Sequence, residues 1–191
     1  MSMSSDPKHL ILLALDNVPS YRFVDELKKH HLPFIEEFFV NQGVYTFKCI
    51  TVFPSSTAPA HASLLTGKLP VEHEVLGMKI WNRVTNTYFD FTKLSPYFAE
   101  RTNSVLSKSV KNIFEHWKGN SVSSHFYFRG ATQKILTPSR LLHLYTYKTV
   151  FSWNKLIRNY TIPRLYKRLA TITNPHLEVI WLPETDEISH K

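Results

Sequence analysis

An uninterrupted apolar run near the start of the chain constrains the fold most strongly. Residues 10–15 read Leu-Ile-Leu-Leu-Ala-Leu, and the run ends at Asp16. A continuous apolar run of this kind, with no alternating polar residues, is typical of a strand buried on both faces of a parallel sheet. Open α/β sheets bind their ligands at the carboxyl ends of such strands, so Asp16 is a candidate ligand-binding residue. The alternative, that Asp16 only caps the next turn, stays open at this point.

The residues that follow predict an order of strand, helix and strand. Residues 21–42 carry apolar side chains at helical spacing that is interrupted at Pro33, which predicts two helical pieces or a kink. Gly43 then precedes residues 44–53, which we expect to form a second strand. The same signals predict a helix over residues 109–117 and strands over residues 122–128 and 177–182. This alternation predicts an α/β fold with a mostly parallel sheet and helices on both faces.

The segment 51–67 combines a strand end, a loop of hydroxyl residues and a short helix. Residues 60–66 read as helix, Pro59 suits its first turn, and Gly67 suits the position just after its end. Thr57 therefore lies at a helix start, where free N–H groups and the helix dipole favour an anion and help a hydroxyl lose its proton. Thr57 could also serve only as an N-cap. Ser55 and Ser56 are the neighbouring alternatives for a reactive hydroxyl.

The spacing of several residues in this segment resembles one known family. The matching positions are Phe53, Pro54, Thr57, Pro59, His61, Thr66, Gly67, Pro70 and His73. They resemble the nucleophile segment of the type I phosphodiesterase and nucleotide pyrophosphatase family, part of the alkaline phosphatase superfamily. The resemblance implies an alkaline phosphatase-like α/β fold and a phosphodiester or nucleotide substrate.

The same resemblance implies a set of site residues. Thr57 would attack phosphorus, form a covalent phosphothreonine that water hydrolyses, and bind one of two divalent metal ions, expected to be zinc. Asp16 would bind the same ion as Thr57. Asp186 and His190 stand four residues apart after a predicted strand, which places a carboxylate and an imidazole on one face of a helical turn. By resemblance they form the ligand pair of the second ion.

Asn17 stands where the family usually has a glycine after the aspartate, and two further positions, after Gly67, depart from the family pattern. Glu74 stands where the family has glycine, and Met78 stands where it has an asparagine that hydrogen-bonds the phosphoryl oxygen. Removing one such hydrogen-bond donor lowers the catalytic rate by about a hundredfold or more. Asn82 is the candidate that would take over the role of the missing asparagine. His61 and His73 are interpreted as structural residues near the site.

The family also places an Asp-His pair and one more histidine downstream of His190. We therefore expect that the sequence is either the front part of a longer enzyme or a truncated chain with an incomplete catalytic site. A second hypothesis is a non-catalytic relic that binds phosphate-bearing partners, and a third is a related transferase or sulfatase on the same scaffold.

The positive charge is concentrated in one part of the chain. The net charge is +8, and residues 129–168 contain nine Lys or Arg, with no Asp or Glu between Glu115 and Glu178. Aromatic residues are interleaved with these charges, a mixture found on surfaces that meet nucleic acid or anionic membranes. The alternative is a solvated helical insertion over residues 136–174 of a single domain that spans residues 1–191.

Cysteine content and the amino-terminal residues bear on the compartment. Cys49 is the single cysteine, so no intramolecular disulfide can form. The apolar run at residues 10–15 is too short for a signal core or a membrane span. We therefore expect a cytoplasmic protein.

Overall fold

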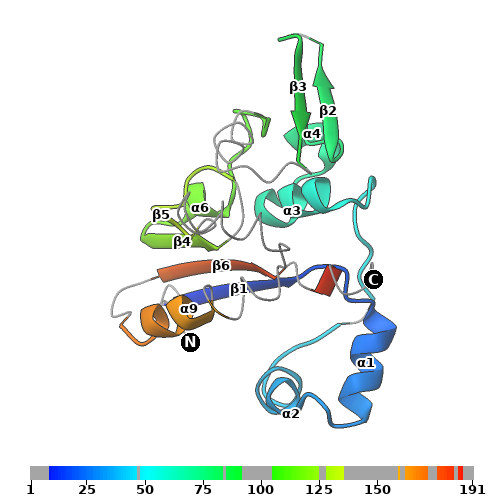
Figure 1. The fold of residues 1–191 in the computed structure, drawn as a ribbon, viewed down its shortest axis with the longest axis vertical. Helices are drawn as coiled ribbons and strands as arrows, with labels where there is room; N and C mark the ends of the chain where they lie inside the picture. The colour runs from blue at the N-terminus through cyan, green and yellow to red at the C-terminus, as the bar shows by residue number, and fades with distance from the viewer. Residues whose placement is uncertain are drawn as a thin grey trace, which may run out of the picture.

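The fold is built on a four-stranded, fully parallel sheet (Figure 1). The computed structural model describes residues 9–46, 48–83, 85–91, 105–124, 128–135, 159, 162–171, 176–182 and 185–186. Within this part, the strand order is β1-β6-β4-β5, with bounds His9–Leu15, His176–Leu182, Asn120–Ser124 and Gln133–Ile135. The predicted α/β fold with a parallel sheet is confirmed.

The first and last strands of the sequence lie side by side in this sheet. Leu15 at the end of β1 is aligned with Leu182 at the end of β6. The backbone N–H of Asp16 extends the ladder by donating to the Leu182 carbonyl at 3.2 Å. Because parallel strands have their carboxyl ends at the same edge, residues that follow β1 and β6 meet there.

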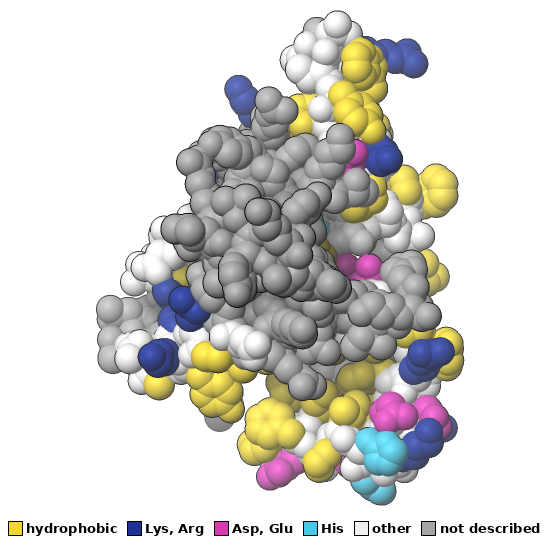
Figure 2. Space-filling view, viewed as in Figure 1, with side chains coloured by type: hydrophobic (Ala, Val, Ile, Leu, Met, Phe, Trp, Pro, Cys, Tyr) yellow, Lys and Arg dark blue, Asp and Glu magenta, His cyan; other side chains and the backbone are white. Residues whose placement is uncertain are grey.

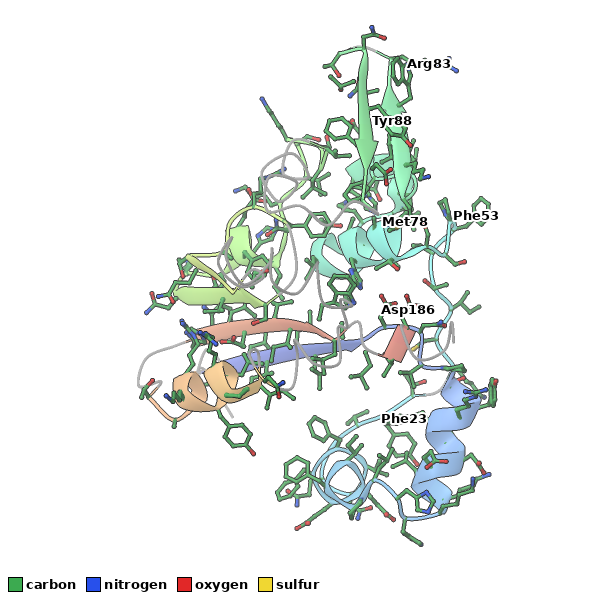
Figure 3. All side chains as sticks on the ribbon, in the orientation of Figure 1. Phe23, Phe53, Met78, Arg83, Tyr88 and Asp186 are labelled. Atoms are coloured by element: carbon green, nitrogen blue, oxygen red, sulfur yellow. The ribbon has the colours of Figure 1, made fainter. Side chains whose placement is uncertain are left out.

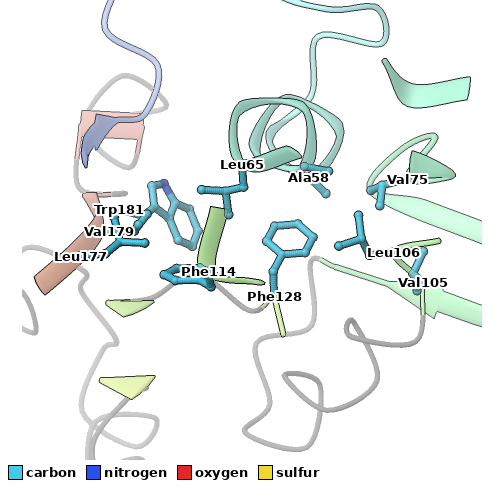
Figure 4. Close-up of a cluster of buried hydrophobic side chains, with 11 residues drawn as sticks. Ala58, Leu65, Val75, Val105, Leu106, Phe114, Phe128, Leu177, Val179 and Trp181 are labelled. Carbon is cyan, nitrogen blue, oxygen red and sulfur yellow. The ribbon is translucent and has the colours of Figure 1, made fainter. Parts of the chain in front are cut away.

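One face of the sheet is covered by helix α3 (Thr57–Thr66). Alternate side chains of β6, namely Leu177, Val179 and Trp181, are buried with α3 residues in a single apolar cluster (Figure 4). The cluster also contains Ala58, Ala62, Leu65, Val75, Val105, Leu106, Phe114 and Phe128. Since α3 contributes small residues on this side, its backbone packs close to the sheet.

Helix α9 (Ile162–Leu169) packs on the opposite face. Successive strand side chains point to opposite faces, so Glu178 lies on the side away from Val179. The Arg168 guanidinium approaches the Glu178 carboxylate at 3.6 Å from α9. Helices therefore cover both faces of the sheet, as the sequence predicts.

Strand β1 is less buried than its sequence predicts. Ile11 is 53% and Leu13 is 50% exposed, whereas a strand covered on both faces would bury them. Together with Leu15 these side chains face away from the core, and Leu13 and Leu15 line an open apolar groove of about 620 Å³. β1 is the edge strand, and the helical segment beside it leaves this groove open.

That helical segment follows β1 and has the predicted break. Helix α1 (Ser20–Lys28) ends before Pro33, and α2 (Pro33–Ile35) continues into the π-helical turn η1 (Glu36–Val40). Figure 2 shows apolar side chains over the lower end of the molecule, where α2 and η1 lie. Phe38 and Phe39 are among the exposed aromatic residues there.

The prediction of a strand over residues 44–53 is wrong for the residues that the structure describes. Residues 44–46 and 48–53 follow an irregular path, and Val44 and Ile50 are almost fully exposed. A strand needs a ladder partner, and the described neighbour of β1 is β6, which comes from the other end of the sequence. The β-forming residues of this segment therefore find no place in the sheet.

The middle of the chain forms short elements above α3 in Figure 1. Helix α4 (Pro70–His73) leads into a hairpin of β2 (Lys79–Asn82) and β3 (Thr87–Asp90). Helix α6 (Ile113–His116) is shorter than predicted because the Asn112 side chain caps it, accepting from Phe114 N at 2.9 Å. Strand β4 ends at Ser124, and residues 125–127 lie outside the described part.

Most of the predicted basic insertion also lies outside the described residues. Of residues 136–174, the structure describes 159 and 162–171. Pro163 lies in the first turn of α9, where its missing N–H needs no partner. No helix in the described ranges is long and apolar enough to span a membrane.

Candidate functional site

Asp16 lies where β1 and β6 end together, and contacts from the β6 side position it. Its Oδ2 accepts a hydrogen bond from Trp181 Nε1 at 3.1 Å. Its backbone carbonyl accepts another from the Thr185 hydroxyl. The carboxylate is thus held at the carboxyl edge of the sheet, where the sequence predicts a ligand-binding residue.

Thr57 reaches the same carboxylate from helix α3. Its Oγ1 donates to Asp16 Oδ2 at 3.5 Å, the long limit of a hydrogen bond. The helix begins at Thr57, three residues earlier than predicted, because Pro59 is accommodated in the first turn. Ser56 is the N-cap residue, with extended backbone angles. The alternative that Thr57 is the N-cap is therefore wrong, and its hydroxyl faces Asp16.

Asp186 lies on a short helical turn after β6 (Figure 3). Its charge acts on Asp16: burial is the main cause that raises the pKa of Asp16 above 3.8, and repulsion from Asp186 is the second. Hydrogen bonds from Trp181 and Thr57 partly oppose this shift. The structure thus brings together Asp16, Thr57 and Asp186, while His190 lies outside the described residues.

A divalent cation would relieve the repulsion between these two carboxylates. Carboxylate and hydroxyl oxygens are ligands that zinc accepts alongside imidazole. Among the residues that the structure describes, no group of three or more His, Cys, Asp or Glu side chains could hold a metal ion. The donor types at Asp16, Thr57 and Asp186 fit a cation, and the described part contributes only a portion of a full ligand set.

Both histidines near the site behave as structural residues. His61 packs edge-on against Trp181, with ring centroids 5.0 Å apart, and burial lowers its pKa to about 4. His73 is fully buried: its Nε2 lies 2.8 Å from Ser63 Oγ, and its Nδ1 accepts from Val75 N at 3.1 Å. His73 therefore connects α4 to α3.

The two departures from the family pattern after Gly67 have clear structural consequences. Glu74 adopts a left-handed conformation with φ of 66°, a geometry that glycine adopts at less cost. Met78 places its Sδ 3.3 Å from the backbone N of Ala58, beside Thr57. Asn82, considered as a substitute donor, instead accepts from Thr85 N at 3.0 Å in the hairpin turn.

Trp181 is the site residue that sequence reasoning missed. It lies in an apolar strand and reads as a core residue, and it is indeed 8% exposed. The available signal was its indole N–H, a buried donor that needs an acceptor. Its position next to the strand end makes the residue after β1 the natural acceptor.

Comparison with known proteins gives an independent indication of family. A sequence model described as type I phosphodiesterase / nucleotide pyrophosphatase matches residues 10–191. Bis(5'-adenosyl)-triphosphatase ENPP4 from Homo sapiens is 25% identical over 130 residues, which is 65% of this chain and 28% of that protein. The ENPP4 protein from Pongo abelii matches to the same extent.

Solved structures show the same fold. Murine ectonucleotide pyrophosphatase / phosphodiesterase 5 (ENPP5) matches with a TM-score of 0.66 and 15% identity, over 96% of this chain and 45% of that chain. An inactive variant of it in complex with AMP matches with a TM-score of 0.66 and 14% identity, over 97% of this chain and 46% of that one. Human ENPP5 gives a TM-score of 0.63 and 14% identity, over 94% and 44%. The chain spans less than half the length of these proteins.

Proposed function

This chain belongs to the type I phosphodiesterase / nucleotide pyrophosphatase family, and we propose on that premise that it hydrolyses phosphodiester or pyrophosphate bonds of nucleotides with Thr57 as nucleophile. The substrate class is taken from two relatives, a bis(5'-adenosyl)-triphosphatase and an ENPP5 variant in complex with AMP. The comparisons do not favour the alternative of a non-catalytic binding protein, and most of residues 129–168, through which it would act, lie outside the described part of the chain.

One observation carries the proposal: the 3.5 Å contact between Thr57 Oγ1 and Asp16 Oδ2. These residues come from the first turn of a helix and the end of a parallel strand, with Asp186 beside them. A hydroxyl directed at a carboxylate is held in one orientation, which favours attack on a phosphorus bound at the helix start.

In the proposed reaction, a bond forms between Thr57 Oγ1 and phosphorus as the bond from phosphorus to the leaving oxygen breaks. The proton of the Thr57 hydroxyl passes through water to the leaving oxygen, which departs as an alcohol or a phosphate. A water molecule then attacks the phosphothreonine: its OH group bonds to phosphorus, the bond from phosphorus to Thr57 Oγ1 breaks, and its other proton restores the Thr57 hydroxyl as the phosphate product leaves. Asp16 orients the hydroxyl before attack, and the indole of Trp181 holds Asp16 in place.

We further propose that this chemistry uses two divalent metal ions, zinc being the expected one. Asp16 and Thr57 would hold one ion, and Asp186 and His190 the other, with further ligands needed to complete both sets. When bound, such ions lower the pKa of coordinated hydroxyls and neutralise the charge that develops on phosphoryl oxygens. The raised pKa of Asp16 next to Asp186 supports a cation at this edge.

The proposal is tested by replacing the hydroxyl residues of the loop one at a time. Thr57→Ala should reduce hydrolysis of bis(4-nitrophenyl) phosphate by at least about a thousandfold, the scale of losing a nucleophile. Ser56→Ala is the matched control, because it removes the neighbouring hydroxyl and should retain most activity. Hydrolysis that survives Thr57→Ala while metal is present would exclude Thr57 as nucleophile.

The single-domain organisation over residues 1–191, with a basic insertion at about 136–174, remains a proposal, and so does the cytoplasmic location. Limited proteolysis would test the first, because an exposed insertion should be cut before the sheet. Localisation of a tagged full-length protein would test the second.

A further inference from the structure

Met78 makes a contact at the start of α3 that the proposed reaction does not use. The backbone N–H of Ala58, the second residue of the helix, donates to Met78 Sδ at 3.3 Å. A thioether sulfur is a weak acceptor. The N–H groups of a first helical turn interact much more favourably with the oxygens of an anion.

The hairpin holds Met78 in this position. The Met78 carbonyl accepts from Phe91 N at 2.8 Å, and the next residue, Lys79, pairs with Asp90 at the base of the hairpin. In Figure 3 the labelled Met78 lies beside the end of α3 at which Thr57 begins the helix. The backbone of Met78 is therefore fixed, while its side chain is half-buried and unbranched.

The position of this sulfur conflicts with phosphate binding at Thr57. Thr57 and Ala58 are consecutive, so a phosphoryl group at Thr57 Oγ1 brings one of its oxygens toward the Ala58 N–H. The sulfur occupies the acceptor position that this oxygen needs. A methionine side chain has three rotatable bonds and can move aside without a backbone change.

We propose that Met78 is a specificity-determining plug, which a substrate phosphoryl group must displace from the Ala58 amide. This inference rests on the proposed binding of a phosphoryl group beside Thr57. Small anions such as inorganic phosphate gain little beyond that amide contact, so the plug discriminates against them. Larger phosphodiesters gain binding energy elsewhere and displace the sulfur more readily.

The test is the binding of inorganic phosphate to the full chain. Titration calorimetry measures the affinity, and the NMR shift of the Ala58 amide reports binding at that position. Met78→Ala should bind phosphate about three to ten times more tightly than the natural chain, the factor expected for one weak hydrogen bond that no longer competes. Leu76→Ala is the matched control, since it truncates a 54% exposed apolar residue in the same loop. The control should leave phosphate affinity unchanged.

Because Met78 packs against the core cluster, Met78→Leu serves as a second variant that keeps the apolar bulk and removes the sulfur. It should also bind phosphate at least about twofold more tightly. If both folded variants bind phosphate as the natural chain does, and the Ala58 amide does not shift, the plug is overturned.

The outcomes for the plug and for the proposed function are separable. Phosphate binding needs no turnover, so it can be measured in a Thr57→Ala background. If the Met78 variants bind phosphate more tightly but hydrolysis does not depend on Thr57, the plug is supported and Thr57 is excluded as the nucleophile. If hydrolysis depends on Thr57 but the Met78 variants show no gain in phosphate affinity, only the plug is refuted.

Discussion

Trp181→Phe should destabilise the chain because it removes the indole donor that holds Asp16. The indole Nε1 lies 3.1 Å from Asp16 Oδ2, and the side chain is 8% exposed. A hydrogen bond to a charged group is worth about 1.5–3 kcal/mol. The substitution also removes apolar volume, which has a separate packing cost.

Trp117→Phe is the matched control for that packing cost. Trp117 packs against the same apolar cluster, but its buried Nε1 has no hydrogen-bond partner in the described part of the chain. Both substitutions remove the same atoms. The free energy of unfolding should therefore fall by about 1.5–3 kcal/mol more for Trp181→Phe than for Trp117→Phe. Urea unfolding at pH 7.5, followed by far-UV circular dichroism with a chelator present, measures this difference.

The pH dependence provides an independent check with a defined sign. Burial and Asp186 raise the folded-state pKa of Asp16 above 3.8. The contribution of this group to stability is therefore complete below about pH 3.8 and is lost as the pH rises through the folded-state pKa. Loss of the indole donor raises that pKa further, so the extra cost of Trp181→Phe should shrink toward pH 4. Equal stabilities of the two variants at pH 7.5, or an unchanged difference at pH 4, would refute the role given to the indole.

Three further predictions concern the site and a turn. Asp16→Asn should raise the free energy of unfolding at neutral pH in the presence of a chelator, because it removes a buried charge that Asp186 repels. Zinc at a hundred times its dissociation constant should stabilise the natural chain by about 2.7 kcal/mol and the variant by almost nothing, as measured by urea unfolding. His61→Phe should flatten the dependence of the free energy of unfolding on pH between about pH 6.5 and pH 4. Burial holds the folded-state pKa of His61 at about 4, so the stability that this residue contributes is complete above pH 6.5 and is lost as the pH falls toward 4. Gly130→Ala should lower the free energy of unfolding by about 1–3 kcal/mol, since φ is +96° and a Cβ would lie 2.8 Å from the Glu115 side chain. Gly67→Ala, where φ is +66° and a Cβ would meet no atom within 4 Å, should lower it by less in the same denaturation assay.

The parallel sheet could be predicted because its strands carry strong local signals. The run at residues 10–15 is apolar and bounded by His9 and Asp16, residues 177–182 are apolar apart from Glu178, and both form strands. Their adjacency could not be predicted, since pairing depends on contacts across the whole chain. The segment 44–53 carries a similar local signal, but the prediction of a strand there was wrong. Its residues favour a strand, yet no described strand pairs with it.

The positions of the candidate site residues could be predicted where a local motif exists. Thr57 was proposed from its place at a helix start and Asp16 from its place after a strand, and the structure brings these two side chains together; their roles stay a prediction. Trp181 escaped identification because its role depends on which element faces it, and a buried indole has no sequence pattern that distinguishes a site contact from core packing. Met78 was identified as a departure from the family pattern, but its contact with the Ala58 amide could not be predicted from the sequence.

The contacts around Asp16 differ in strength on its two sides, and this difference bears on the chemistry. On the sheet side, Leu182, Trp181 and Thr185 all bond to Asp16, through its backbone and its carboxylate. On the helix side, Thr57 donates a 3.5 Å bond to the carboxylate, at the limit where hydrogen bonds become weak. The carboxylate is therefore positioned by the sheet, whatever the state of the helix. Any ligand that draws Thr57 closer to Asp16 would gain the difference between a weak hydrogen bond and a normal one, and the cost would fall on α3, which packs on β6 through apolar side chains and the edge-on contact of His61 with Trp181. In the proposed reaction, the alignment of Thr57 with a phosphoryl group would therefore be set by how α3 packs on the sheet.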